Sequence, residues 1–234
     1  MLPSLTVEIW SDVVCPWCYI GKRRFETAAA QLRDEVDLQV VFRPYQLDPT
    51  ASPGKSQPVI EAYAKKFGGP ERAAQIIDNV TNVAAAEGLE FHMDKALRAN
   101  TLLAHRALLL AEGSGQQYEL KERLLQAYFV DGLDIGDPDV LADCAAEVGM
   151  PRDIVRAYLD STDGVSEVHQ QLRLAAELEI TAVPTFVLDG RWSIPGAQDP
   201  ETFVNVIRRL LQRREAEAPA PAATDACDDE SCDV

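Results

Sequence analysis

The chain has 234 residues, of which 47% are hydrophobic, so it can bury the core of one large domain or of a small domain with a sizeable insertion. Its 22 lysines and arginines against 38 aspartates and glutamates give a formal net charge of −16, which would repel nucleic acid and anionic membranes, and we expect neither as a partner. No window approaches the roughly 18 consecutive apolar residues of a membrane-spanning helix, and the first residues carry no signal-peptide pattern, so we predict a cytoplasmic location.

The N-terminal segment predicts a strand, a turn and a helix in close succession. Residues 5–10 alternate and are rich in strand formers, and they run through residues 11–14 into Cys15-Pro16-Trp17-Cys18. Residues 16–32 have apolar positions at helical spacing, with Pro16 in the first turn, where proline is tolerated. A second strand within residues 36–47 would complete a βαβ unit, whose crossover is usually parallel and right-handed.

The rest of the chain predicts an α/β class with a long helical insert. From residue 56 to about 178, amphipathic helical segments are separated by glycine and proline. Asp189-Gly190 then lies between two strand-like runs, residues 181–188 and 191–194, which predicts a hairpin. Residues 200–214 predict a final amphipathic helix. Residues 215–234 form an acidic, proline- and alanine-rich tail that holds Cys227 and Cys232 at C-x4-C spacing.

The strongest chemical signal is the C-x2-C motif at Cys15 and Cys18. Disulfide exchange needs an attacking thiolate, a second thiol to resolve the mixed disulfide, and a local field that ionises the first thiol. Cys15 would lie at a helix N-terminus, where unpaired amides and the helix dipole favour a thiolate, and Cys18 would be better shielded. A C-x2-C pair is also half of a zinc site. The strand-to-helix context and Pro184, at the start of the late hairpin, favour the redox interpretation.

Together these motifs resemble the DsbA-type thioredoxin superfamily, and specifically the FrnE-like thiol oxidoreductases. The matching segments are Cys15-Pro16-Trp17-Cys18-Tyr19-Ile20-Gly21, Asn100-Thr101 with Ala104-His105-Arg106, Val183-Pro184-Thr185-Phe186 and Ile194-Pro195-Gly196-Ala197-Gln198. The resemblance implies a thioredoxin fold with a large all-helical insertion: residues 1–50 and 179–214 form the thioredoxin-like domain, and residues 51–178 form the insertion.

The resemblance also implies roles for residues. Cys15 would be the nucleophile, Cys18 the resolving thiol and Pro184 a cis-proline, with the main chain of Val183 offered to an extended substrate. Oxidised or unfolded proteins would be the substrates, and a small thiol or a reductase would recharge the enzyme. No cofactor is expected, and glutathione is the candidate reductant.

Further residues are candidates on weaker grounds. We expect Trp17 and Phe186 to line a hydrophobic groove beside Cys15, together with Tyr19. Asp12 and Glu8 lie where a carboxylate could relay the proton of Cys18, and His105 is a third relay candidate. The structural alternatives are a solvated loop acid at Asp12, a strand-edge acid at Glu8 and a hydrogen-bonded core histidine at His105. Cys144 is expected to be a small buried hydrophobe, and Asn100-Thr101 to cap a helix.

Two other functions stay open. One is a glutathione-dependent transferase or isomerase acting on small molecules. Kappa-class glutathione transferases and 2-hydroxychromene-2-carboxylate isomerases share this architecture but resemble it with a serine at the Cys15 position and no second cysteine, so the pair here favours dithiol chemistry. The other is a zinc-binding redox sensor that uses Cys15, Cys18, Cys227 and Cys232, although no metal is our expectation. Cys227 and Cys232 are also a candidate auxiliary redox pair, with a solubilising acidic tail as the alternative.

Overall fold

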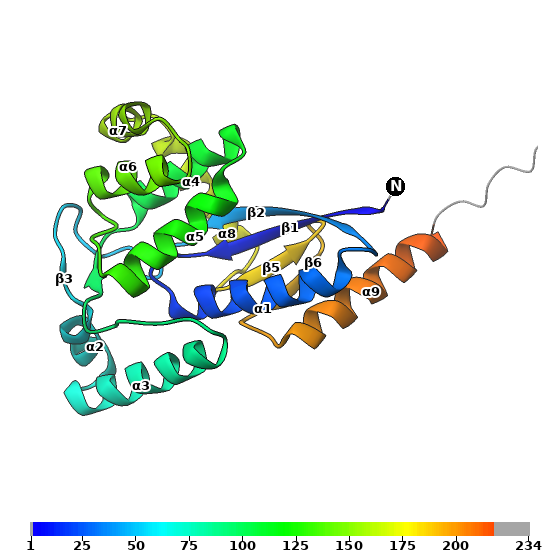
Figure 1. The fold of residues 1–234 in the computed structure, drawn as a ribbon, viewed down its shortest axis with the longest axis horizontal. Helices are drawn as coiled ribbons and strands as arrows, with labels where there is room; N and C mark the ends of the chain where they lie inside the picture. The colour runs from blue at the N-terminus through cyan, green and yellow to red at the C-terminus, as the bar shows by residue number, and fades with distance from the viewer. Residues whose placement is uncertain (1, 218–234) are drawn as a thin grey trace, which may run out of the picture.

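The computed structural model describes residues 2–217. β1 (Ser4–Ser11), α1 (Pro16–Leu32) and β2 (Asp37–Pro44) form the predicted βαβ unit, in which β1 and β2 are parallel. β5 (Thr185–Leu188) lies antiparallel to β1, and β6 (Trp192–Pro195) lies antiparallel to β5. The sheet order is therefore β2-β1-β5-β6 (Figure 1). α9 (Pro200–Glu217) ends the described part of the chain.

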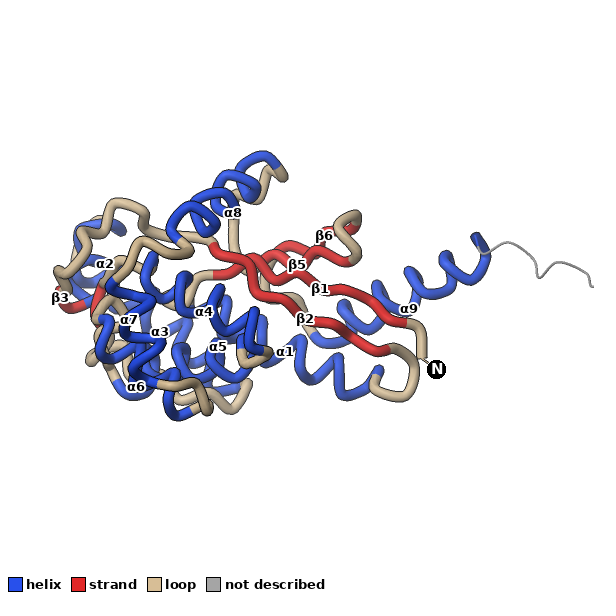
Figure 2. The backbone as a smooth tube through the Cα atoms, turned by 90° about the horizontal axis from the view of Figure 1, so that it is seen from above, coloured by secondary structure: helices blue, strands red, loops and turns tan. Residues whose placement is uncertain are grey.

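Helices cover both faces of this sheet, with α1 and α9 on one face and α8 (Val165–Glu177) on the other (Figure 2). Because side chains alternate along a strand, Leu5, Val7 and Ile9 of β1 face α1 and α9. Trp10 faces the opposite side, where it packs with Ala175 of α8. The sheet core is therefore divided into two layers by the strand alternation.

The residues between β2 and β5 form a mostly helical insertion. Its helices are α2 (Val59–Phe67), α3 (Pro70–Ala86), α4 (Leu102–Ser114), α5 (Gln117–Gln126), the π-helix η1 (Ala127–Asp131), α6 (Pro138–Glu147), α7 (Arg152–Asp160) and α8. The prediction of an all-helical insertion is wrong in one detail, because β3 (Gln57–Pro58) and β4 (Leu97–Arg98) pair as antiparallel strands. Strands of two residues are too short to leave an alternating sequence pattern.

The active-site region is packed into the insertion. Val13, Tyr19 and Ile20 belong to the hydrophobic cluster that the insertion helices form, whereas Phe25 belongs to the sheet core. The loop before α1 and the first turn of α1 are therefore held between the two cores. Within residues 2–217, no helix has the length and apolar character needed to cross a membrane.

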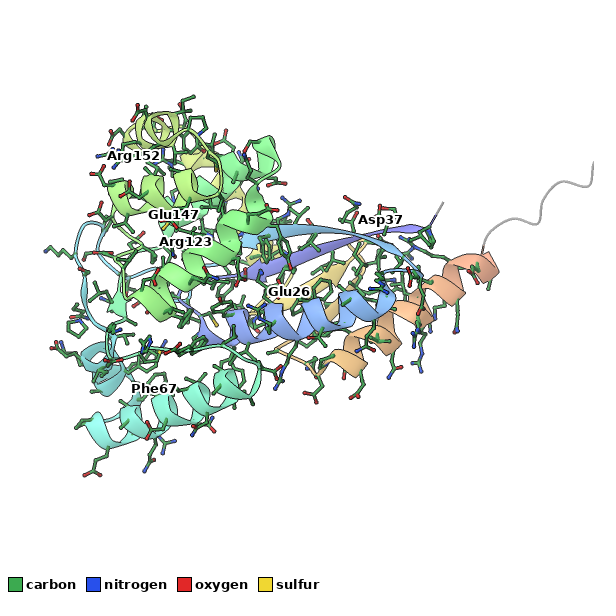
Figure 3. The ribbon with its side chains drawn as sticks, in the orientation of Figure 1. Glu26, Asp37, Phe67, Arg123, Glu147 and Arg152 are labelled. Atoms are coloured by element: carbon green, nitrogen blue, oxygen red, sulfur yellow. The ribbon has the colours of Figure 1, made fainter. Side chains whose placement is uncertain are left out.

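α1 is joined to α5 by a partly buried cluster of charges. Lys22 is 2% exposed, and its Nζ lies 2.5 Å from a carboxylate oxygen of Glu26 and 2.6 Å from one of Glu122 on α5. The hydroxyl of Tyr118, also on α5, donates to Glu26 at 2.6 Å. Figure 3 shows Glu26 on the side of α1 that faces α5. This cluster fixes how α5 lies against the helix that carries the cysteines.

The late hairpin is confirmed, with one difference. Asp189 and Gly190 both have positive φ angles, 48° and 64°, as a two-residue type I′ turn requires. The first strand of the hairpin begins at Thr185 rather than at residue 181. Pro184 has no N–H to donate to a strand ladder, so pairing starts after it.

Candidate active site

The two cysteines occupy the first turn of α1. Cys15 is the N-cap residue in an extended conformation, with φ −89° and ψ 115°, and Pro16 follows at the first helical position. A proline suits this position because its missing N–H would have had no helical partner. The amide of Cys18 donates to the carbonyl of Cys15 at 3.0 Å. Both cysteines are free thiols and are 3% exposed.

The surroundings of the two thiols shift their pKa values in opposite directions. A hydrogen bond with the Cys18 side chain is the main cause that lowers the pKa of Cys15, and the amides of Cys18 and Trp17 act in the same direction. Burial raises the pKa of Cys18 well above its ordinary value, and its hydrogen bond with Cys15 raises it further. Cys15 is therefore the thiol that ionises first, and Cys18 keeps its proton.

The loop before β5 lies against Cys15. The Val183–Pro184 peptide bond is cis, and the Cys15 thiol donates to the carbonyl oxygen of Val183 at 3.7 Å. The amide of Gly196 donates to the carbonyl of Pro184 at 2.7 Å. On α1, a Cβ at Gly21 would lie 2.8 Å from Cγ of Pro184. The absence of a side chain at Gly21 therefore allows this loop to pack against the cysteine helix.

Asp12, three residues before Cys15, forms a buried polar pair with His105 of α4. Asp12 is fully buried; its Oδ1 accepts from the amide of Val13 at 2.8 Å, and its Oδ2 accepts from the amide of Leu47 at 2.7 Å. Nε2 of His105 lies 3.1 Å from Oδ1 of Asp12 and 3.0 Å from the carbonyl oxygen of Tyr45. Both partners are acceptors, so Nε2 carries a hydrogen. The alternative of a solvated loop acid at Asp12 is wrong.

Glu8, the remaining relay candidate, has a different partner. It lies in the middle of β1, the strand between β2 and β5, so it is not at a sheet edge. Its carboxylate is 2.8 Å from Arg43 of β2, which also contacts Glu112 of α4 at 3.2 Å. The structure therefore places Glu8 in an ion-pair cluster on the sheet and does not bring it to the cysteine pair.

The predicted groove of aromatic side chains is only partly present. Trp17 is 40% exposed and stands on the surface between the two cysteine positions. The prediction for Phe186 is wrong, because it is fully buried between Phe25 and Phe203, with ring centroids 5.4 and 4.6 Å away. Tyr19 is also buried, and its hydroxyl donates to a carboxylate of α5. Phe186 points inwards because its strand position faces α1 and α9.

A pocket of about 590 Å³ opens next to the active-site loop. Its lining includes Val14 of that loop, Tyr63 of α2 and Tyr128 of η1, together with the lysines Lys65 and Lys66. Burial raises the pKa of Tyr63 to about 12, and a negative charge on Cys15 adds to this effect, so Tyr63 lies within electrostatic range of the thiolate. The pocket therefore offers apolar walls and positive charge beside Cys15.

One charged residue near the cysteines was missed by the sequence analysis. Lys121 of α5 is 1% exposed, and burial lowers its pKa to about 8. The negative charges of Cys18, Asp12 and Cys15 act on it in the opposite direction. A signal was present, because the buried positions of α5 are Gln117, Leu120, Lys121, Leu124 and Leu125, the spacing of one helix face.

The remaining predicted residues are structural or lie outside the described chain. Cys144 is buried in the insertion core as expected, and burial raises its pKa to about 11. Asn100 accepts from the amide of Leu102 at 2.9 Å at the start of α4, whereas Thr101 makes no capping bond with its side chain. Cys227 and Cys232 lie outside residues 2–217, so their role and the four-thiolate zinc site stay predictions.

Residues 6–208 match the family described as the DSBA-like thioredoxin domain. The chain belongs to the DSBA-like thioredoxin domain family. It is 30% identical over 206 residues to the "Uncharacterized protein YwbO" of Bacillus subtilis (strain 168), covering 87% of this chain and 96% of that protein. The predicted family and fold class are confirmed, and the FrnE-like subtype is consistent with this membership.

Two solved structures are similar to this chain in fold. The "probable DsbA oxidoreductase SCO1869" from Streptomyces coelicolor is 35% identical, with a TM-score of 0.81 and coverage of 98% of this chain and 99% of that chain. The "cytosolic disulfide reductase DsbM from Pseudomonas aeruginosa with GSH" is 19% identical, with a TM-score of 0.59 and coverage of 88% and 99%. The second likeness shows the fold alone. The family supports an oxidoreductase activity for this chain.

Proposed function

We propose that this chain reduces or isomerises disulfide bonds in cytoplasmic proteins through the Cys15–Cys18 dithiol. The observation that supports this most strongly is the opposite ionisation of two free thiols in one helical turn, with the pKa of Cys15 lowered and that of Cys18 raised. A dithiol of this kind needs one reactive thiolate and one thiol that stays protonated until it is required.

The reaction has two exchange steps. The Cys15 thiolate attacks one sulfur of the substrate disulfide, a Cys15–substrate disulfide forms, and the other substrate sulfur leaves and takes a proton. Cys18 then loses its proton and attacks the Cys15 sulfur, which releases the second substrate sulfur and leaves a Cys15–Cys18 disulfide. The substrate gains two electrons, and a thiol reductant such as glutathione, or a reductase, must return the enzyme to its dithiol state.

The surroundings of Cys15 fit a polypeptide substrate. The carbonyl of Val183, which accepts from the Cys15 thiol at 3.7 Å, belongs to the loop before β5, and we assign its main chain to pairing with an extended substrate backbone. Trp17 presents an exposed aromatic surface next to the thiols. We assign substrate contacts to Trp17 and Val183, and a positioning role beside Cys15 to Pro184.

The buried pair of Asp12 and His105 is our candidate for proton relay. The 3.1 Å hydrogen bond from Nε2 to Oδ1 joins the imidazole of His105 to the carboxylate of Asp12, which lies three residues before Cys15. The negative charge of Asp12 also opposes ionisation of Cys15. A relay partner for Cys18 must be near the thiols and shielded from bulk water, and Asp12 and His105 meet both conditions, whereas Glu8 is held by Arg43.

A second function, glutathione-dependent chemistry on small molecules, is favoured by the pocket beside Cys15. Lys65 and Lys66 line it, and they could bind the carboxylates of a tripeptide. The DsbM structure, which shares the fold, was solved with GSH. The second thiol at Cys18 is not needed for conjugation, so protein disulfide exchange remains our first proposal.

Two assays separate these functions. We expect the enzyme to catalyse insulin reduction by glutathione, with loss of activity in Cys15→Ser and retention in Cys144→Ala, a buried cysteine outside the site. Conjugation of glutathione to an aryl halide should stay at the uncatalysed rate. Catalysed conjugation without insulin reduction would instead establish the small-molecule function.

A further inference from the structure

Cys18 must lose its proton before it can resolve the mixed disulfide. This inference rests on the proposed dithiol exchange. Cys18 is 3% exposed, and burial raises its pKa well above the ordinary thiol value. It must nevertheless become a thiolate to attack Cys15. Because bulk water does not reach it freely, its proton needs an acceptor inside the protein.

The packing of α5 against α1 brings Lys121 to the Cys18 side of the cysteine helix. Glu122, the next residue along α5, receives the hydroxyl of Tyr19 at 2.8 Å and Nζ of Lys22 at 2.6 Å. Cys18 directly precedes Tyr19 and lies one helical turn before Lys22, on the same face. The positive charge of Lys121 accordingly acts on Cys18, and the charge of Cys18 acts on Lys121.

The amine of Lys121 lies near an aromatic ring and makes no hydrogen bond within residues 2–217. Gln117, one turn earlier on α5, is fixed by two hydrogen bonds to the backbone of Phe42, at 2.8 and 3.0 Å. Nζ of Lys121 lies 5.5 Å from the centre of the Phe42 ring. Among residues 2–217 this Nζ has no hydrogen-bond partner. A buried amine without partners favours its neutral form, because an unpaired buried charge is costly.

A small pocket is lined by both Lys121 and His105. It has a volume of about 10 Å³, and Gln117 also lines it. This volume is close to what one water molecule occupies. One water there would bridge the amine and the ring of His105, which in turn contacts Asp12, so a proton on Lys121 would have a route away from the cysteines.

We propose that Lys121 is the internal base that takes the proton from Cys18 when the mixed disulfide is resolved. The S–H bond of Cys18 breaks, and the proton passes through one intervening water molecule to the neutral amine of Lys121. The resulting thiolate attacks the Cys15 sulfur, a Cys15–Cys18 bond forms, and the bond from Cys15 to the substrate sulfur breaks, so that the substrate leaves as a thiolate. No electron passes to Lys121. The ammonium formed then stabilises the nearby thiolate until the proton leaves. When the Cys15–Cys18 disulfide is reduced, Lys121 takes up a proton again and passes it to Cys18.

The charges around Lys121 set the pH range of this step. The groups whose charges act on Lys121 are Cys15, Cys18, Asp12 and Lys22. The pocket that Lys121 lines is also bordered by His105, Arg43 and Glu112. The two thiolates and Asp12 favour the ammonium form, whereas burial and Lys22 favour the neutral amine. Burial is the largest effect and brings the pKa to about 8. The resolution rate should therefore rise as the pH passes through about 8.

Single-turnover kinetics of two variants test the proposal. The reduced protein is mixed with excess oxidised glutathione between about pH 6 and 10, quenched in acid, and analysed by mass spectrometry. Formation of the glutathione adduct on Cys15 reports attack, and its conversion to the Cys15–Cys18 disulfide reports resolution. Lys121→Arg keeps the positive charge but cannot accept a proton. Lys121→Met removes both the charge and the group that accepts the proton. Lys95→Met makes the same change at an exposed lysine and is the control.

In Lys121→Arg we expect attack within about twofold of the wild-type rate and resolution slowed at least about tenfold, so that the adduct accumulates. In this variant the pH at which the resolution rate rises should lie above 8, because Cys18 must then lose its proton without an internal base. Lys121→Met should show the same defect in resolution with slower attack as well, and Lys95→Met should match the wild type. Circular dichroism establishes that each variant is folded.

Resolution within twofold of the wild type, with the same pH profile in both Lys121 variants, would overturn the role of Lys121. A different failure would concern the proposed function: a wild-type protein that forms neither the adduct nor the Cys15–Cys18 disulfide would refute the dithiol exchange itself.

Discussion

The residues around Cys15 and Cys18 combine hydrogen bonding with deep burial. Asp12, His105 and Lys121 are each at most 3% exposed, although such polar groups are rarely buried without compensation. Asp12 and His105 compensate each other through hydrogen bonds, whereas the Nζ of Lys121 has no hydrogen-bond partner within residues 2–217. The protein therefore bears a stability cost at Lys121, and this cost can be measured.

Lys121→Met should stabilise the protein at neutral pH. The pKa of Lys121 is lowered from 10.5 to about 8, so its charged form weakens the folded state by about 3 kcal/mol below about pH 8. The cost fades as the pH rises from about 8 to about 10.5, where both folded and unfolded chains hold a neutral amine. Urea unfolding should therefore show a gain of about 3 kcal/mol at pH 7 that disappears near pH 10.5. A gain that does not change with pH would contradict this account.

The two candidate acids before the cysteines should behave differently when neutralised. In Asp12→Asn the amide cannot replace a carboxylate that accepts from Leu47, Val13 and His105, and we expect a loss of about 2–3 kcal/mol in the free energy of unfolding and slower disulfide exchange. Glu8→Gln is the matched control. Its partly exposed ion pair contributes at most about 1 kcal/mol, and exchange should be unchanged. Equal effects of the two substitutions on exchange would argue against the Asp12–His105 relay.

At this scale the sequence located the cysteine motif and the proline loop better than it predicted burial. Cys15, Cys18 and Pro184 stand in motifs whose spacing reflects a local turn, so they could be found without a structure. Phe186 was misassigned because alternation shows that strand residues face two sides but does not show which side is the core. Lys121 was missed because a lysine among charged residues suggests a solvated helix face, although its position on the apolar stripe of α5 indicated burial.

At the scale of elements, the site depends on the contact between α1 and the loop before β5. Gly21 allows Pro184 to approach α1, and the amide of Gly196 holds the carbonyl of Pro184 from the β6 side. The carbonyl of Val183 reaches Cys15 as a result. Two segments more than 160 residues apart are thus joined by a close backbone approach. The β-α-β and β-β-α pattern predicted that they would meet, whereas the steric role of Gly21 required the structure.

Gly21→Ala should disturb this contact. The added methyl group would lie 2.8 Å from Cγ of Pro184 and 3.3 Å from Cβ of Ala197, so the loop must shift. Overpacking of this kind costs about 1–3 kcal/mol, and we expect slower exchange because Val183 moves relative to Cys15. Gly113→Ala in α4 is the control, because a Cβ there meets nothing within 4 Å, and it should leave both stability and exchange unharmed. Thermal unfolding and insulin reduction measure the two effects.

At the scale of the whole molecule, the active-site loop lies between two hydrophobic cores. Val13 and Ile20 pack into the insertion, and Phe25 and Phe186 pack into the sheet. The fold class followed from the sequence because helical and strand patterns alternate in long, distinct blocks. The β3–β4 pair could not be predicted from the sequence, because each strand has only two residues. The packing of the insertion against the cysteine turn is long-range, and no local pattern reports it.

We expect the acidic tail to affect turnover but not the reduction potential of the Cys15–Cys18 couple. Cys227 and Cys232 lie beyond residue 217, and we propose from the sequence that they exchange disulfides with the active site. Deleting residues 219–234 should then change turnover with insulin while leaving the reduction potential of the Cys15–Cys18 couple unchanged. Identical turnover in the truncated protein would favour a solubilising tail.

Trapping the mixed disulfide tests the central claim most directly. In Cys18→Ser, incubated with insulin and quenched in acid, the account predicts a stable disulfide between Cys15 and an insulin cysteine, identified by peptide mass mapping. In Cys15→Ser no such adduct should form, because burial keeps Cys18 protonated. An adduct on Cys18 in the Cys15→Ser protein, or no adduct on Cys15 in the Cys18→Ser protein, would contradict the assignment of Cys15 as the attacking thiolate.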